Sequence, residues 1–264
     1  MLKTRLIPVL ILKNGILVRS ESFKFHQSIG NPIHEVERFN EWNVDELIYL
    51  DISDNNSNTS ERMDSKIKKL GDSLNILEKV SKTCFMPLTW GGNIKTINDM
   101  EKRFQKGADK ISINSAAMYN PGLIHEAACN FGTQAIVVSI DVFADVNGKR
   151  EVFINGGKSS TGKDPIEWAK EVEKLGAGEI LLQSINNDGR GEGYDLDLIE
   201  EVSKTVNIPV IACSGVGEYK DFVKGVEAGA SAVAAANIFH FKEMSDRYAK
   251  RVMKNAGINV RKIK

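Results

Sequence analysis

Short runs of apolar residues recur along the chain, separated mostly by segments whose apolar residues follow a helical spacing. Each run has the length of a strand covered on both faces, because such strands are continuously apolar rather than alternating. The order of strands and helices predicts an α/β protein with a parallel sheet. The predicted strands are Leu6–Leu12, Leu47–Ile52, Met86–Trp90, Lys110–Ile113, Ala135–Ile140, Glu179–Leu182, Ile208–Cys213 and Ala232–Ala236.

The clearest helical segment follows Asp164. Asp164 can cap the helix, Pro165 suits the first helical position, and Gly176 is typical of a residue just past a helix end. Eight strands with intervening helices match a (β/α)8 barrel, the TIM barrel, better than an open sheet. An open doubly wound sheet would more often contain a G-x-G-x-x-G turn, and the sequence contains none.

The sequence also repeats itself at half its length. The stretch that begins "MPLTWGGN" at Met86 aligns without gaps on the one that begins "IPVIACSG" at Ile208, and Pro87 aligns with Pro209 at an offset of 122 residues. This period is too long for a solenoid and indicates two fused half-barrels. We expect a single domain over residues 1–264, with a polar insertion near 53–71.

Composition narrows the classes of function. The 264 residues include 35 basic and 35 acidic ones, and this balance argues against a nucleic acid or a membrane held by net charge. We find no signal peptide and no apolar segment of membrane-spanning length. The three cysteines are widely spaced, which favours free thiols in the cytoplasm. No metal and no cofactor are expected.

Small and polar residues end four of the predicted strands and lead directly into helices. Backbone N–H groups at such junctions bind phosphate well. Two equivalent phosphate-binding turns at the mouth of a barrel would suit a small molecule that is phosphorylated at both ends. The predicted phosphate-binding residues are Gly92, Asn93, Asn114, Ser115, Ser214, Gly215 and Asn237.

Motifs along nearly the whole chain resemble one known family. The segments "GGNIKT", "GADKISINSAAMYNPGLI", "VVSIDV", "DGRGEGYDLDLI" and "ANIFHF" are similar to the cyclase subunit of imidazole glycerol phosphate synthase. The resemblance implies a barrel that receives ammonia from a glutaminase subunit. It also implies that the barrel adds this ammonia to a doubly phosphorylated ribulosyl carboxamide, giving imidazole glycerol phosphate and an aminoimidazole carboxamide ribotide.

The resemblance further implies two aspartates, at the ends of strands one and five, as general acid and base. Asp141 in "VVSIDVF" matches the strand-five aspartate, whereas the strand-one position is Ile11. An alkyl side chain transfers no proton, and loss of an acid–base group typically costs about 10²–10⁴ in rate. The other mouth residues that we predict are Arg19, Asp51, Asp188 and Gly189.

Charged residues at the starts of four strands match a second feature of the family. The resemblance implies that they form a ring that gates ammonia entry on the face that binds the glutaminase. Any one of them alone would be better explained as an exposed residue on the bottom face, but two bases and two acids can pair around the axis. The predicted gate residues are Arg5, Glu46, Lys110 and Glu179.

Ile11 favours the function that is typical of one branch of this family. The segments "IPVLILKNGILVRS" and "CFMPLTWGG" resemble the glycosyl amidation-associated proteins, which have an aliphatic residue at the strand-one position. We therefore expect a subunit that docks a glutaminase and channels ammonia to a separate sugar amidotransferase. That enzyme would turn an acetamido into an acetamidino sugar in surface polysaccharide or flagellin glycan synthesis.

Two alternatives stay open. The first is a cyclase, a lyase of histidine biosynthesis, whose acid–base chemistry runs through Asp141, Asp51 or Asp188 despite Ile11. The second is an isomerase like the related half-barrel histidine enzyme. The isomerase is disfavoured because it too would need a strand-one aspartate.

Overall fold

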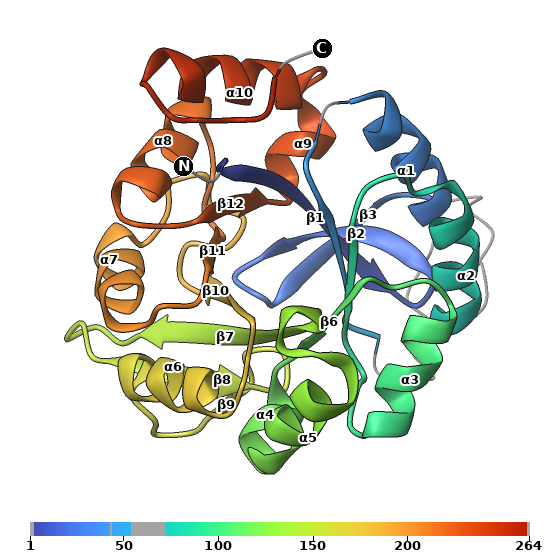
Figure 1. Ribbon diagram of the computed structural model, residues 1–264. Coiled ribbons are helices and arrows are strands. Elements are labelled where there is room, and N and C mark those ends of the chain that lie inside the picture. Colours follow the sequence, from blue (N-terminus) through green and yellow to red (C-terminus); the bar gives the residue numbers. More distant parts are fainter. Residues whose placement is uncertain (1–2, 43, 54–71, 263–264) are drawn as a thin grey trace.

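Eight parallel strands close into a barrel in the computed structural model, which describes residues 3–42, 44–53 and 72–262. Each strand pairs with the next around the ring, and β7 pairs with β10 as well as with β6, so the sheet closes on itself (Figure 1). The prediction of a (β/α)8 barrel is therefore confirmed. In order around the ring, the barrel strands are β1 (Arg5–Lys13), β4 (Leu47–Asp51), β5 (Leu88–Gly91), β6 (Lys110–Ile113), β7 (Ile136–Ala144), β10 (Glu179–Ser184), β11 (Val210–Cys213) and β12 (Ala232–Ala235).

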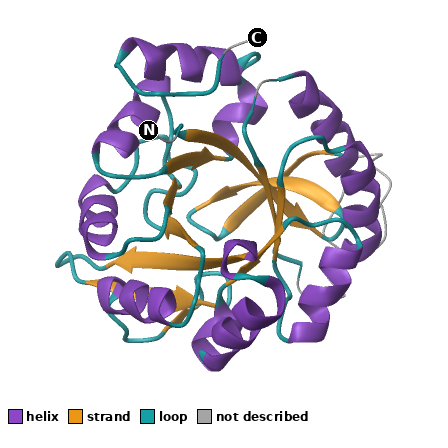
Figure 2. Cartoon of the chain, viewed as in Figure 1, coloured by secondary structure: helices purple, strands orange, loops and turns teal. Residues whose placement is uncertain are grey.

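Helices surround this barrel on its outside (Figure 2). Helix α6 begins as its sequence predicts, because the Asp164 side chain accepts hydrogen bonds from the N–H groups of Ile166 and Glu167, and Pro165 follows at once. The described helices are α1 (Pro32–Glu41), α2 (Ser73–Thr83), α3 (Ile97–Gln105), α4 (Ser115–Tyr119), α5 (Gly122–Phe131), the 3-10 helix η1 (Thr133–Ala135), α6 (Pro165–Lys174), α7 (Leu196–Thr205), α8 (Tyr219–Glu227), α9 (Asn237–Phe241) and α10 (Ser245–Asn255).

Four antiparallel strands extend the barrel and are absent from the sequence prediction. Strand β1 continues into a hairpin formed with β2 (Ile16–Glu21) and β3 (Phe25–Gly30). Strand β7 continues into β8 (Arg150–Ile154) and β9 (Ser159–Ser160). Strands β3, β8 and β9 are short or half exposed, and only the first three residues of β2 are apolar, so all four lack the long apolar runs that identified the barrel strands.

Alternation along each barrel strand separates two cores. On β1, Ile7 and Val9 belong to a small core inside the barrel, whereas Leu6 and Leu10 belong to the larger core under the helices. The same parity places Ile11 and Asp141 on the inner face, because Ile11 follows Val9 and Asp141 lies four residues beyond Val137. The inner core comprises Ile7, Val9, Ile48, Val137, Leu181, Ile211, Cys213, Ala232 and Ala234.

The half-chain repeat is confirmed by matching elements. Strands β5 and β11 have equal length and are offset by 122 residues, as are β6 and β12, α3 and α8, and α4 and α9. The turns before α3 and α8 match in backbone conformation, because Gly92 and Asn93 in the first, and Ser214 and Gly215 in the second, all have positive φ angles. The two halves therefore place similar turns at the same end of the barrel.

Two further features bear on the sequence predictions. Within the described residues, no helix has the length and apolar character needed to cross a bilayer. The predicted insertion near 53–71 lies outside the described residues, apart from Ser53.

Candidate functional site

A large cavity opens at the carboxyl ends of the barrel strands. Its volume is about 1540 Å³, and residues from every barrel strand or from the loop that follows it line the cavity. This is the end at which barrels of this fold hold their active sites. We call this end the mouth and the opposite end the bottom.

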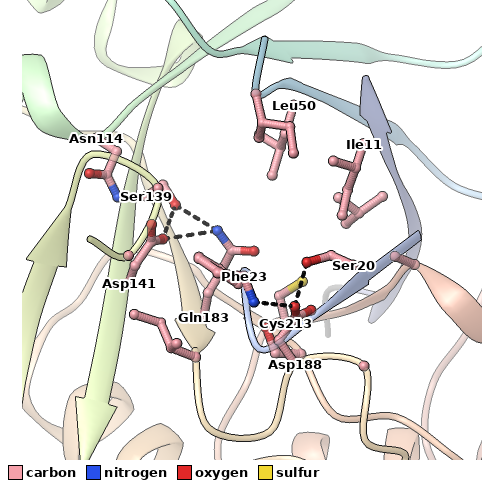
Figure 3. A pocket seen from close by; sticks show the side chains of 18 of the residues that line it. Ile11, Ser20, Phe23, Leu50, Asn114, Ser139, Asp141, Gln183, Asp188 and Cys213 are labelled. Atoms are coloured by element: carbon pink, nitrogen blue, oxygen red, sulfur yellow. Dashed lines mark hydrogen bonds between the residues drawn. The ribbon is translucent and has the colours of Figure 1, made fainter. Parts of the chain in front are cut away.

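Asp141 on β7 is a buried carboxyl of the mouth, and polar side chains of β7 and β10 contact it. Its Oδ1 accepts hydrogen bonds from Ser139 Oγ at 3.0 Å and from Gln183 Nε2 at 3.0 Å (Figure 3). Burial raises the pKa of Asp141 to about 6, these hydrogen bonds oppose the rise, and the charge of Asp188 adds to it. A carboxyl with such a pKa can exchange protons near neutral pH.

Ile11 lies across the cavity from Asp141 (Figure 3). It is paired in register with Leu50 on β4, and the two side chains form an apolar wall of the mouth. The structure thus places the predicted acid–base position where the sequence expected it, and that position holds no proton-transfer group.

Asp188 lies in the loop after β10 and is held by the β2–β3 hairpin. Its Oδ2 accepts hydrogen bonds from Ser20 Oγ at 2.7 Å and from the Phe23 N–H at 3.1 Å (Figure 3). Burial raises the pKa of Asp188, although both of these hydrogen bonds lower it. Gly189 completes the contact, because a Cβ there would lie 2.2 Å from the Ser20 carbonyl oxygen.

Asp51 also borders the mouth, but on the other face of its strand. Leu47 and Tyr49, which share its parity on β4, face the helices, whereas Ile48 and Leu50 face the barrel interior. Asp51 Oδ1 accepts a hydrogen bond from the Ser53 N–H at 3.0 Å. Its carboxylate also interacts with the buried Arg103 of α3. Asp51 therefore stabilises the rim and does not face Asp141.

The two predicted phosphate turns are present, but the reason for their glycines differs from the prediction. We expected glycine to leave backbone N–H groups uncovered. Instead a Cβ at Gly92 would lie 2.0 Å from the Asp51 carbonyl oxygen, and one at Gly215 would lie 2.1 Å from that of Gly193. At both positions only glycine fits, because a side chain would collide with the backbone of the neighbouring segment. Arg103 braces the first turn through long hydrogen bonds to the carbonyl oxygens of Gly92 and Asn93, each 3.4 Å.

The polar residues after β6 and β12 have unequal hydrogen bonding. Ser115 Oγ accepts a hydrogen bond from the Asn155 N–H at 2.9 Å, and Asn237 Nδ2 donates to the Ser20 carbonyl oxygen at 3.2 Å. By contrast, Asn237 Oδ1 is buried without a hydrogen-bond partner in the described part of the chain, and Asn114 Nδ2 has only the nearby Asp141 carboxyl as a partner. Buried polar atoms of this kind are where a bound polar ligand would complete the hydrogen bonding.

The rim of the cavity is basic although the chain as a whole is neutral. Among the described lining residues, seven are lysine or arginine and three are aspartate. Arg19 lies over the Phe241 ring at 6.0 Å. An excess of positive charge around a concave site raises the local concentration of anions. The seven are Lys13, Arg19, Lys24, Lys95, Lys158, Arg190 and Lys242.

At the bottom, the four predicted gate residues form one closed ion-pair network. Arg5 Nη1 lies 2.8 Å from Oε1 of Glu46 and 2.8 Å from Oε1 of Glu179. Lys110 Nζ lies 3.2 Å from Glu46 and 3.0 Å from Glu179. Burial opposes the charge on Arg5, but Glu179 and Glu46 outweigh it, so the pKa of Arg5 is raised. The structure brings together all four residues that the sequence singled out.

Sequence reasoning missed three residues that shape the mouth: Ser139, Gln183 and Arg103. Ser139 lies two positions before Asp141 on the same face of β7, and Gln183 is paired with Asp141 in register on β10. A polar residue at such a position in an otherwise apolar strand was an available signal. Arg103 gave no signal, because a basic residue in a predicted surface helix is ordinarily exposed.

Comparison with known proteins gives a consistent result. The family described as "Histidine biosynthesis protein" matches residues 5–245. The "Imidazole glycerol phosphate synthase subunit HisF" of Clostridium botulinum (strain Okra / Type B1) is 44% identical over 269 residues, which cover 99% of this chain and 100% of that protein. The protein of the same name from Natranaerobius thermophilus is 42% identical over 262 residues, with the same coverage.

These comparisons correct the predicted function. We expected an ammonia-channelling subunit for sugar amidation, on the basis of Ile11 and the motifs around it. The similar proteins are instead named as subunits of imidazole glycerol phosphate synthase, and they align with 99% of the chain. The prediction of sugar amidation is therefore wrong, and placement on the glycosyl amidation-associated branch is not supported. One aliphatic residue was too little evidence against the rest of the sequence.

Proposed function

We propose the function of this chain from one premise: it belongs to the histidine biosynthesis protein family, and within it to the HisF-type cyclase subunits. On this proposal it is the cyclase, or lyase, subunit of an imidazole glycerol phosphate synthase. It would bind the doubly phosphorylated ribulosyl carboxamide at the mouth and add ammonia to it there. The products would be imidazole glycerol phosphate and the aminoimidazole carboxamide ribotide that the family resemblance implies.

Asp141 is the observation that carries this proposal. Its carboxyl is buried in the mouth, is oriented by Ser139 and Gln183, and has a pKa of about 6. Proton transfer to and from a reacting nitrogen is best served by a group whose pKa lies near the working pH. We infer that Asp141 is one of the proton-transfer groups of the cyclase.

The basic rim and the two turns support a substrate with phosphate at both ends. The turns at Gly92–Asn93 and Ser214–Gly215 each precede a helix of nine residues, and the N-terminus of a helix favours an anion. The buried Asn237 amide leaves one polar atom for a ligand, and the Asn114 amide, which interacts with Asp141, lines the same cavity. We propose that one phosphate binds in each half of the barrel, near these residues and Ser115.

The bottom network supports a glutaminase partner. Charged groups at this end have no catalytic use in this fold, and a partner that covers them is tolerated best when opposite charges already pair. We propose that a glutaminase subunit docks around Arg5, Glu46, Lys110 and Glu179 and delivers ammonia through the barrel. With Lys110→Met in a reconstituted complex, the ratio of glutamate formed to imidazole glycerol phosphate formed should rise; an unchanged ratio would contradict the gate.

We also infer that residues 1–264 act as one domain. The two ends of the described chain meet, because the Thr4 N–H donates to the Asn259 carbonyl oxygen at 2.8 Å and Thr4 bridges to Val260. In addition, α10 packs against α8. Both contacts join the C-terminal segment to the barrel.

The decisive test uses the isolated chain. We would supply the doubly phosphorylated carboxamide with ammonium chloride at pH 8 and measure imidazole glycerol phosphate by chromatography. We expect turnover by the wild-type chain and its loss in Asp141→Asn. Absence of turnover in the wild type, and also in Ile11→Asp, would reject the cyclase function.

A further inference from the structure

We propose that Asp188 supplies the second proton-transfer group of the cyclase, in place of the carboxyl that is absent at Ile11. This inference rests on the proposed function. It is specific to the described geometry, in which the β2–β3 hairpin brings a carboxyl from the loop after β10 to the mouth.

The chemistry requires two groups. When the ammonia nitrogen bonds to a carbonyl carbon it becomes positively charged, so it must give a proton to a base. When the C–N bond to the departing carboxamide ribotide breaks, the leaving nitrogen keeps the bonding electron pair and must gain a proton from an acid. The carbonyl oxygen takes up protons and leaves as water, so protons are both accepted and donated in each turnover, and no oxidant or reductant is needed. A carboxylate and a carboxylic acid on different residues meet both demands.

Three carboxyls border the mouth in the described part of the chain, and the geometry leaves one partner for Asp141. Asp51 lies on the outward face of β4 and interacts with Arg103. Asp188 faces the same cavity as Asp141 (Figure 3), and the charges of the two are close enough to interact. Asp188 and Asp141 are both buried, with relative exposures of 8% and 6%, and within the described residues no cation contributes to the pKa shift of either.

The hairpin holds Asp188 at a single oxygen. Ser20 Oγ and the Phe23 N–H both donate to Oδ2, and the Ser22 N–H donates to the Asp188 backbone carbonyl oxygen at 2.9 Å. Asp141 is likewise held at Oδ1 by Ser139 and Gln183. Asp188 is thus fixed in orientation while its second oxygen remains to exchange a proton, and the Asp141 carboxyl is contacted in addition by the Asn114 amide. On this inference Ser20 is a positioning residue for Asp188.

The titratable groups that face Asp188 come from three elements. Glu21 lies on the hairpin, Asp141 on β7 and Cys213 on β11. The two acidic neighbours disfavour a second negative charge. A pair of interacting carboxyls gives up its protons in two steps that belong to the pair. The pH profile of turnover should therefore change when either member is removed.

The experiment measures ammonia-dependent kcat for Asp188→Asn, which keeps a side-chain oxygen to accept from Ser20 and Phe23. We expect kcat to fall by about 10²–10⁴, with little change in the affinity for the doubly phosphorylated carboxamide, measured by calorimetry without ammonium. Glu192→Gln is the matched control, because Glu192 is an exposed carboxylate in the same loop, and it should keep the wild-type rate. Ser20→Ala should lower kcat less and shift the pH profile.

The decisive variant is the double mutant Ile11→Asp/Asp188→Asn. Ile11 faces the cavity across from Asp141, so an aspartate there restores a second carboxyl by another route and should recover at least tenfold of the lost kcat. Failure of this rescue, or weaker substrate binding in Asp188→Asn, would leave Asp188 with a structural role only and overturn the inference. Wild-type turnover that persists within threefold in Asp188→Asn would overturn it while the cyclase function stands. A wild type that gains activity only with Ile11→Asp would also overturn it.

Discussion

The two ends of this barrel handle buried charge in opposite ways. At the bottom, Arg5 and Lys110 pair with both Glu46 and Glu179, so the network as a whole is neutral. At the mouth, Asp141 and Asp188 are more deeply buried than the bottom bases and are held only by neutral donors in the described structure. Both carboxyls consequently have raised pKa values, mainly because of burial.

The backbone conformation also differs between the two ends, and the mouth is again the less relaxed of the two. Turns at the bottom that adopt positive φ after a helix use glycine, at Gly107, Gly132, Gly176 and Gly229. Loops at the mouth adopt positive φ at glycines such as Gly92 and Gly215, but also at residues with side chains, where it costs free energy. The residues with side chains are Asn14, Ser22, Phe23, Asn93, Asn155 and Ser214.

The comparison separates stability from function within one fold. At the bottom, the charges are paired and glycines follow the helices, and both features favour a stable fold. Uncompensated carboxyls and strained loops at the mouth lower stability and persist where binding or catalysis needs them. We therefore expect substitutions at the mouth to trade activity for stability, and substitutions at the bottom to lose stability.

The largest effect should come from Asp141→Asn on turnover. Asparagine keeps an oxygen to accept from Ser139 and Gln183, but it exchanges no proton. Ammonia-dependent formation of imidazole glycerol phosphate should fall by about 10²–10⁴. In the wild type, a plot of kcat against pH should change slope near pH 6, because the pKa of Asp141 is about 6.

A loss of less than tenfold in Asp141→Asn, with the change of slope near pH 6 still present, would show that another group titrates there. Asp197→Asn, an exposed carboxylate in the first turn of α7, serves as the control and should keep the wild-type rate.

The sequence predicts the buried barrel strands of this molecule better than the strands that extend them at the mouth. All eight barrel strands were found because their buried faces require continuous apolar runs, and the 122-residue repeat was confirmed element by element. The antiparallel extensions β3, β8 and β9 were missed because short or half-exposed strands leave no such run, and β2 was missed because only its first three residues are apolar. Yet the hairpin β2–β3 orients Asp188.

The candidate site was predictable in its residues but not in its hydrogen bonding. Asp141, Asp188 and the four bottom charges were singled out by motif and position. Ser139 and Gln183 were polar residues in apolar strands, a signal that was available, but their hydrogen bonds depend on strand register, and Ser20 meets Asp188 only through a loop contact that sequence spacing does not fix. The predicted function was wrong because it weighed Ile11 above full-length similarity, although a nearby loop carboxyl can lie at the same mouth.

The second prediction concerns stability and again uses Asp141→Asn. The pKa of Asp141 is raised from 3.8 to about 6 in the folded state, so the folded protein holds this proton more tightly than the unfolded chain does. The stabilisation that this proton gives is complete below about pH 4 and is lost as the pH rises through about 6. Above that pH the buried carboxylate costs folding free energy.

Asp141→Asn removes this cost. Its free energy of unfolding should exceed that of the wild type by up to about 3 kcal/mol at pH 8, and the difference should shrink toward zero near pH 4. Urea unfolding at several pH values without phosphate measures it. A difference that does not depend on pH would mean that the buried carboxylate is compensated after all.

At the bottom, Glu179→Gln should destabilise the protein. The variant leaves two cations facing Glu46 alone, although the amide oxygen still accepts hydrogen bonds. Breaking a fully buried pair costs about 3–5 kcal/mol; because side chains here remain 10–21% exposed, we expect about 1–2 kcal/mol. Adding Lys110→Met to Glu179→Gln restores neutrality and should recover part of the loss, and a double mutant less stable than the single one would contradict a balanced network.

The smallest effect tests the strain at the mouth. Ser214 has a φ of 80°, which a residue with a Cβ adopts at a cost, and it aligns with Gly92 in the other half of the barrel. Ser214→Gly relieves that strain but raises the entropy of the unfolded chain, so we expect a net gain of only about 0.5 kcal/mol in the free energy of unfolding. Gly229→Ala is the opposite change at the bottom, where φ is 107° and a Cβ would lie 2.9 Å from Ser203 Cβ, and it should lower stability. Urea unfolding of both variants at pH 8 measures the pair. If Ser214→Gly were destabilising, the Ser214 side chain would contribute more to the fold than its backbone strain costs, and the contrast between a strained mouth and a relaxed bottom would fail at this turn.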